Sequence, residues 1–293
     1  MISIIICSRS KVIDPDLLNN IQSTIGVPFE TIVIDNSTNI YSIFNAYNKG
    51  VSLSQFPLLC FIHDDINLKT NNWGMRILDH FNDSETGAIG IAGSPYSALM
   101  PGSWWAGELV NINIVPWNAE NGSANFSSYP KTTLNKNQVI TLDGVWFCIK
   151  KELFECIKFD DESFSGFHFY DIDISMQINK LGYKLYCVFD ILIEHFSKGD
   201  MNINWIENAF IINKKWQRQL PITCVKLTYT EQCEAELKTL KEMVMVMLQN
   251  KQSKKDTYTI AFKQLRRFYR GYFYPPIIMQ LGKYLIGSIV SFN

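Results

Sequence analysis

The chain lacks several features that would place it in a common class of protein. None of its seven cysteines belongs to a C-x-x-C pair, which argues against a zinc ribbon or a thioredoxin-like redox site. No apolar run reaches the roughly 20 residues that a membrane-spanning helix requires. The N-terminus has no basic segment ahead of an apolar one, so we expect no signal peptide. Together with cysteines that sit inside apolar runs, these absences predict a cytoplasmic protein with reduced thiols.

An excess of charge is also missing. The 27 basic and 28 acidic residues give a formal net charge of −1, which argues against non-specific binding of nucleic acid. The loop after the first apolar run is Ser8-Arg9-Ser10, and it is not a Gly-rich phosphate loop, which argues against a nucleotidyltransferase. A hydrophobic content of 47% over 293 residues instead predicts one large domain with a sizeable core, followed by an appendage.

The most informative stretch is Phe61-Ile62-His63-Asp64-Asp65-Ile66, which continues an apolar run from Leu58. The run predicts a buried central strand. Its ionisable residues should lie where the strand leaves the sheet, because burial inside would be costly and ligands of open α/β sheets bind at that edge. On an extended backbone His63 and Asp65 share one side and Asp64 takes the other. Imidazole plus carboxylate favours a divalent-cation site; a solvated acidic turn is the alternative.

Strand and helix patterns alternate on both sides of this stretch, which predicts an α/β fold with helices flanking a sheet. From residue 93 to 137 the pattern loosens and becomes rich in Gly, Pro, Asn, Ser and aromatics. So long an irregular stretch in a compact domain is usually functional. Trp104 and Trp105 within it suit stacking against a sugar ring, although aromatics that pack a loop onto the core are an equally good interpretation.

Three later positions carry further candidates. Asp143-Gly144 joins two short predicted strands, and a turn role is the alternative to ligand binding. Asp171 and Asp173 open a predicted helix, where the dipole favours a carboxylate and where Asp is also a common capping residue. His195 ends the apolar run from Ile191, a pattern that also fits a core histidine.

Taken in order, these motifs resemble a family-two-like nucleotide-sugar glycosyltransferase over roughly residues 1–215. His63-Asp64-Asp65 is similar to the D-x-D signature, with His63 in place of the first Asp. Asp35-Asn36-Ser37 is similar to V-D-D-x-S, and residues 46–50 to A-R-N-x-G, with Tyr47 at the place of the Arg. Residues 143–154 are similar to D-G…R-x-x-F, and residues 170–173 to E-D-x-D, with Tyr170 replacing the Glu.

The resemblance implies a GT-A fold, a Rossmann-like mixed sheet flanked by helices, in residues 1–220. It also implies roles for individual side chains. Asp171 would be the general base, and Mn²⁺ or Mg²⁺ would be held by Asp65, His195 and His63. The nucleotide would contact Ser8, Arg9, Asp35, Asn36, Asn48, Asp64 and Asp65, and the sugar or acceptor would contact Trp104, Trp105, Asp143, Gly144 and Asp173.

The implied activity is metal-dependent, inverting transfer of a sugar from a nucleotide diphosphate sugar, with UDP favoured, to a hydroxyl of a saccharide or lipid-linked acceptor. A non-catalytic binding or scaffold protein that keeps the fold is the alternative from another class, because fold alone does not fix function. Departures from the family pattern at His63, Asn36, Tyr47 and Tyr170 favour the alternative; intact Asp65, Asp171 and His195 favour the enzyme.

The C-terminal region, residues 221–293, lies beyond the resemblance. Residues 231–249 have high helix propensity and an apolar stripe at helical spacing. Residues 263–274 mix basic and aromatic side chains, and an apolar end follows from Ile277. We expect a helical appendage that packs on the catalytic domain or on a second subunit of a homo-oligomer. The composition also fits a peripheral anchor at the anionic inner face of a membrane.

Overall fold

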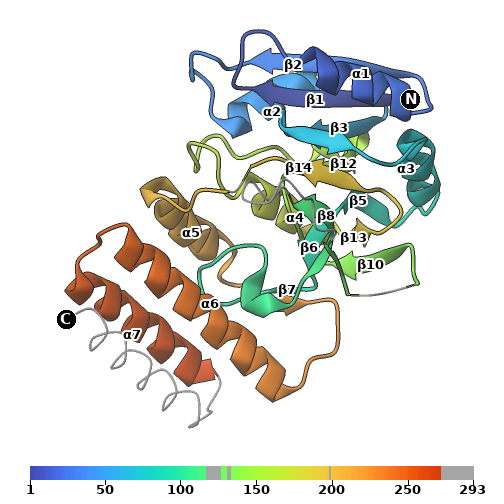
Figure 1. Cartoon of the computed structure of the whole chain (residues 1–293). Coiled ribbons are helices and arrows are strands. Elements are labelled where there is room, and N and C mark those ends of the chain that lie inside the picture. The colour runs from blue at the N-terminus through green and yellow to red at the C-terminus, as the bar shows by residue number, and fades with distance from the viewer. Residues whose placement is uncertain (117–126, 131–132, 198, 272–293) are drawn as a thin grey trace.

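The computed structural model describes residues 1–116, 127–130, 133–197 and 199–271 (Figure 1). Residues 272–293, which hold the apolar end of the predicted appendage, lie outside the described residues. Within the described part, a mixed sheet with flanking helices forms the N-terminal two thirds of the chain, and a pair of long helices follows it (Figure 1). This arrangement agrees with the α/β class and the helical appendage predicted from the sequence.

The main sheet has seven strands in the order β10-β13-β5-β12-β3-β1-β2. β3 is buried along its whole length, because it lies between β1 and β12 and its five residues are all apolar. β1 pairs in parallel with both β2 and β3, so the carboxyl ends of three neighbouring strands meet at one edge. The strands span Ile2–Ser8 (β1), Phe29–Asp35 (β2), Leu58–Ile62 (β3), Thr86–Gly90 (β5), Lys136–Val139 (β10), Trp146–Lys150 (β12) and Lys184–Val188 (β13).

A second sheet, in the order β11-β6-β8-β14-β4, corrects the expectation of an irregular stretch after residue 93. Its strands in that stretch are short and mix polar with apolar residues, so no clear alternation marks them in the sequence. The strands are Ile66–Leu68 (β4), Ala92–Ser94 (β6), Asn111–Pro116 (β8), Thr141–Leu142 (β11) and Ile193–His195 (β14), with Ser127–Tyr129 (β9) paired to β8. A two-stranded pair joins Tyr96–Ser97 (β7) to Ile222–Thr223 (β15).

Helix boundaries follow the capping residues. Asp14 caps α1 and accepts a hydrogen bond from the Asp16 amide, with Pro15 at the first helical position, as predicted. Ser42 caps α2, which therefore begins later than the apolar pattern from Ile40 suggested. The helices span Pro15–Thr24 (α1), Ile43–Leu53 (α2), Trp73–Phe81 (α3), Tyr170–Lys180 (α4), Ile203–Trp216 (α5), Tyr229–Gln249 (α6) and Lys254–Gly271 (α7).

α6 is fastened to the loop that follows β7. The fully buried Glu236 carboxylate accepts hydrogen bonds from the Tyr96 hydroxyl (2.6 Å) and from the amides of Leu99 (2.7 Å) and Met100 (2.9 Å). Apolar residues of α6, such as Leu240, pack against the same loop. The appendage therefore contacts the α/β part of the chain directly. No helix of the described residues is long and apolar enough to cross a membrane.

We expect the Glu236→Gln substitution to lower the free energy of unfolding by about 1–3 kcal/mol, because an amide NH₂ would then face a backbone N–H that has lost its acceptor. Urea denaturation followed by circular dichroism measures this difference. Glu234→Gln, on the exposed side of the same helix, is the matched control and should change stability little. Equal midpoints for the two variants would show that the Glu236 contacts do not stabilise the fold.

Candidate active site

Polar side chains gather at the edge where β1, β2 and β3 end. Ser8 and Asp35 are register partners at the ends of β1 and β2, and Asp64 lies just past the end of β3. Asp64 accepts hydrogen bonds from the Ser8 hydroxyl (3.2 Å) and from the Arg9 amide (2.9 Å). The exposed Arg9 guanidinium contacts both Asp64 and Asp65, each at 3.1 Å. Asp64 thus orders the loop after β1, while Asp35 is exposed and accepts from the Ser37 amide.

His63, Asp65 and His195 form the cluster that the sequence analysis predicted. β14 pairs with β4 so that His195 lies opposite Ile66, and the Phe196 amide donates to the Asp65 carbonyl, which brings the two segments together. Asp65 Oδ1 lies 3.4 Å from His195 Nε2 and 3.8 Å from His63 Nδ1. One potential ligand atom from each of the three side chains lies within 4.8 Å of the others. This confirms the geometric part of the prediction, namely that the three side chains converge.

The chemistry of this cluster fits a divalent cation. Asp65 Oδ1 is buried and makes no hydrogen bond of good geometry among the described residues, although His195 Nε2 lies 3.4 Å away, so the carboxylate oxygen closest to both imidazoles is poorly satisfied. Burial and the neighbouring His195 lower the pKa of His63, which favours the neutral imidazole that ligates metals. Burial alone would raise the pKa of Asp65, but polar contacts with His195 and Ser197 and the nearby imidazoles hold it below its ordinary value. A carboxylate and two neutral imidazoles form a suitable donor set.

Asp171 begins α4, and the Asp143-Gly144 turn lies beside it. The Phe169 backbone adopts a left-handed conformation directly before the helix, and Tyr170 and Asp171 form its first turn. Burial and, to a lesser extent, the negative charge of Asp143 raise the pKa of Asp171 to about 7, while backbone donors act in the opposite direction. A carboxylate with a pKa near neutrality is a stronger base than an ordinary Asp, so Asp171 is suited to accept a proton.

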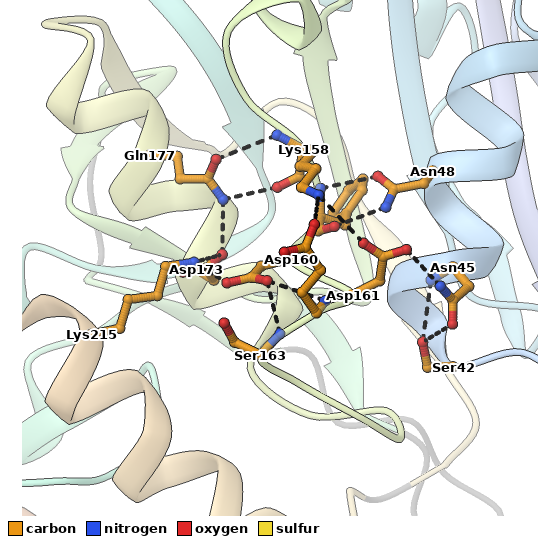
Figure 2. Close-up of polar contacts among 12 residues, drawn as sticks. Ser42, Asn45, Asn48, Lys158, Asp160, Asp161, Ser163, Asp173, Gln177 and Lys215 are labelled. Carbon is orange, nitrogen blue, oxygen red and sulfur yellow. Dashed lines mark hydrogen bonds and ion pairs between the residues drawn. The ribbon is translucent and has the colours of Figure 1, made fainter.

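Three residues that the sequence analysis placed in the site make internal hydrogen bonds instead. Asn36 is buried, and its side chain bonds both the amide and the carbonyl of Tyr41. Asn48 does the same with the backbone of Phe159. Figure 2 shows Asn48 on α2 and Asp173 on α4. The amide nitrogen and oxygen of both Asn36 and Asn48 are thus engaged by the backbone of another segment, which gives each side chain a structural role.

Asp173 is buried between α4 and α5. It accepts hydrogen bonds from the Trp216 indole (2.8 Å), from Gln177 (2.8 Å) and from Lys215, whose ammonium also reaches Asp160 (Figure 2). The hypothesis that Asp173 contacts sugar conflicts with this environment, because its carboxylate is only 1% exposed and already accepts three donors. The observed contacts indicate that Asp173 holds α5 against α4.

The Trp104-Trp105 pair lies in the loop that α6 supports. The Trp105 indole donates to Glu242 of α6 (2.5 Å), and Ser103 donates to the same carboxylate (2.8 Å). The Trp104 indole nitrogen is buried without a partner among the described residues, and its ring packs edge-on against Trp105. Sequence reasoning did not connect this loop to α6, because residues 103 and 242 are far apart and no motif links them.

Tyr170 is a second feature that sequence reasoning did not place in the cluster. It was identified only as a departure from the E-D-x-D pattern, yet its hydroxyl lies 2.9 Å from His63 Nε2. His63 and Tyr170, two residues at which the chain departs from the family pattern, are therefore in contact. A pairing of unusual residues at two family positions is the signal that would have predicted this contact.

Comparison with known proteins identifies related sequences and folds. A family model described as "Glycosyltransferase like family" matches residues 3–207, well over half of the chain. No curated protein matches the chain significantly. A crystal structure of GalNAc-T7 with UDP, GalNAc and Mn²⁺ is similar with a TM-score of 0.50 and 11% identity, covering 74% of this chain and 49% of that one. S. aureus TarS 1-349 in complex with UDP-GlcNAc gives a TM-score of 0.42 and 13% identity, covering 92% and 73%.

This chain thus spans about half the length of the GalNAc-T7 chain, and the likeness at that identity concerns the fold alone. Together with the family model, it confirms the GT-A fold that the order of motifs predicted.

Proposed function

Because this chain belongs to the Glycosyltransferase like family, we propose that it transfers a sugar from a nucleotide diphosphate sugar, a UDP-sugar in the first instance, to an acceptor hydroxyl. The observation that carries the proposal is the convergence of His63, Asp65 and His195 on the buried, poorly satisfied Asp65 Oδ1. A poorly satisfied buried carboxylate oxygen destabilises the fold, so the arrangement favours a site that binds a cation.

The donor would bind at the edge formed by β1, β2 and β3. Arg9 has an exposed guanidinium that bridges Asp64 and Asp65 and is suited to pair with a phosphate. Ser8 and Asp35 lie at neighbouring strand ends and would contact the ribose or the base. Mn²⁺ or Mg²⁺ held by Asp65, His195 and His63 would neutralise the charge of the diphosphate leaving group.

The chain's own residues would carry out the proton transfer. Asp171 would accept the proton of the acceptor hydroxyl as its oxygen attacks the anomeric carbon, while the bond to the diphosphate breaks. A single displacement of this kind inverts the anomeric centre. Asp143 faces the same region and raises the pKa of Asp171, so it would both orient the sugar and strengthen the base.

The acceptor would bind beside the Trp104-Trp105 loop, because indole faces pack well against a sugar ring. Glu242 holds this loop through Ser103 and Trp105. The proposed acceptor is a saccharide or a lipid-linked saccharide. We also propose that residues 221–293 contact a membrane or a second subunit. Sedimentation with anionic vesicles tests the membrane contact.

A calorimetric screen of nucleotide diphosphates and their sugars, with and without Mn²⁺, tests the proposal directly. We expect one nucleotide diphosphate sugar to bind in a Mn²⁺-dependent manner. In the absence of an acceptor, this sugar should be transferred slowly to water, which releases the nucleoside diphosphate. Mn²⁺-dependent binding without any turnover on a panel of saccharides would favour the scaffold interpretation. Absence of binding by every nucleotide would contradict the proposal as a whole.

The raised pKa of Asp171 predicts the pH dependence of turnover. Since the base must be deprotonated, kcat/KM should rise with pH through a pKa of about 7. Asp143→Asn removes a neighbouring negative charge, so the acid limb of the profile should move to lower pH, although burial still keeps it above an ordinary Asp value. Initial rates of UDP release between pH 5 and 9 measure the shift. An acid limb at the same pH in both proteins would show that Asp143 does not act on the base.

A further inference from the structure

Tyr170 lies between two polar partners, and both contacts can be satisfied in only one way. Its hydroxyl oxygen is 2.9 Å from His63 Nε2 and 3.1 Å from the Gly144 carbonyl oxygen. A carbonyl oxygen can only accept, so the single hydroxyl proton must point to Gly144. The tyrosine oxygen then accepts from His63, which requires the proton of that imidazole to be on Nε2.

The other nitrogen of the His63 imidazole, Nδ1, is left with a free lone pair on the side of Asp65. In neutral histidine one ring nitrogen carries the proton, so His63 Nδ1 is unprotonated when Nε2 donates to Tyr170. Nδ1 lies 3.8 Å from Asp65 Oδ1, which makes no hydrogen bond of good geometry among the described residues. Two electron-pair donors thus face each other with no proton between them, and a cation would satisfy both.

The packing around Tyr170 makes it a rigid support. Its ring packs edge-on against Tyr47 and Phe44, with ring centroids 5.4 Å and 6.3 Å apart, and it also packs beside Phe147. Gly144 is required on the other side, since a methyl group added there would overlap the tyrosine hydroxyl. The hydroxyl therefore has little freedom to leave His63.

We propose that Tyr170 is a positioning residue that fixes the Nε2-protonated tautomer of His63 and thereby makes His63 Nδ1 a ligand of the divalent cation. Outer hydrogen bonds of this kind orient ligating imidazoles and increase their basicity. With a second imidazole from His195, the donor set contains two nitrogens and favours Mn²⁺ over Mg²⁺, which prefers oxygen ligands. The inference deepens the proposed function but concerns the metal-binding residues alone, and its test needs neither nucleotide nor acceptor.

The tautomer is measurable by ¹⁵N–¹H correlation spectra of the full chain labelled at its four histidines. We expect His63 to show an Nε2–H and a bare Nδ1 in the metal-free protein, with assignment by loss of its signals in His63→Asn. In Tyr170→Phe this preference should disappear. A wild-type His63 that carries its proton on Nδ1 would overturn the proposal.

Titration with Mn²⁺ alone, followed by paramagnetic broadening of the same signals, gives the second readout. The Tyr170→Phe protein should need about 10–100-fold more Mn²⁺ for half-maximal broadening. Tyr183→Phe is the control for the loss of a tyrosine hydroxyl: Tyr183 lies just past the end of α4, whereas Tyr170 begins that helix, so this change should leave the midpoint unchanged. Unshifted midpoints in Tyr170→Phe, or His63 signals unaffected by Mn²⁺, would refute the assignment even if UDP binds.

Discussion

Replacing Asp171 by Asn should reduce turnover by about 10²–10⁴-fold, the usual contribution of a general base. The amide keeps the size of the side chain and an oxygen that can accept from the Ile172 amide, but it cannot accept a proton at neutral pH. Nucleotide affinity should change little, because Asp171 lies at the start of α4 and, among the described residues, no hydrogen bond or ion pair joins it to the three cluster residues or to the loop after β1. Rates of UDP release at saturating donor, and calorimetric UDP affinity, separate the two quantities.

Asp173→Asn is the matched control for this experiment. It makes the same chemical change two residues further along α4, but at a carboxylate held by Trp216, Gln177 and Lys215. We expect it to lower stability, because it leaves the Lys215 ammonium with a weaker partner, and to preserve the turnover of the folded protein. If Asp171→Asn kept near-normal turnover, Asp171 would only accept from the Ile172 amide in the first turn of α4, and Asp143 would become the better candidate for the base.

Asp171→Asn should raise the stability of the fold at neutral pH, although it lowers activity. The folded-state pKa of Asp171, about 7, is higher than the value of roughly 3.9 expected in the unfolded chain. Between these two pH values the folded protein keeps a proton on Asp171 that the unfolded chain has lost. The free energy of unfolding of the wild type therefore falls as pH rises through this window. Asn has no such loss, so the variant should equal the wild type near pH 4 and exceed it at pH 8. A gain in stability with a loss of activity is the signature of a functional charge.

Much of the fold and the centre of the site could be predicted from the sequence, for physical reasons. The apolar run of β3 has no plausible place except a buried strand, and a strand that ends in His63-Asp64-Asp65 must deliver those charges to an edge. Alternation along the backbone then separates Asp64, which contacts Ser8 and Arg9, from His63 and Asp65. These inferences need only local rules.

The rest depends on long-range contacts that local rules do not contain. Asn36 and Asn48 occupy family positions, but their amides bond the backbones of Tyr41 and Phe159, and nothing in either motif shows this. The C-terminal appendage had the composition of a membrane or subunit contact, yet Glu236 and Glu242 on α6 bind the loop that carries Trp105. Whether a polar side chain faces a ligand or the protein is decided by partners far away in sequence.

Asp65→Asn should abolish Mn²⁺-dependent nucleotide binding. Asp65 is the central residue of the cluster, since Oδ1 is the atom that approaches both His195 (3.4 Å) and His63 (3.8 Å). An amide removes the negative charge and can turn an NH₂ group toward the cation, so the affinity for Mn²⁺ should fall by more than the roughly 10–100-fold that loss of an outer hydrogen bond costs. Calorimetry of UDP with and without Mn²⁺ measures the effect.

Asp64→Asn provides the matched comparison for Asp65, because this neighbouring carboxylate accepts from Ser8 and Arg9 and is not one of the three cluster residues. It should weaken nucleotide binding equally with and without Mn²⁺, since it disturbs the loop after β1 and leaves the three cluster residues in place. Asp65→Asn should instead remove the difference that Mn²⁺ makes. If Mn²⁺ still enhanced UDP binding in Asp65→Asn and not in Asp64→Asn, the cation would be held by Asp64 and not by Asp65.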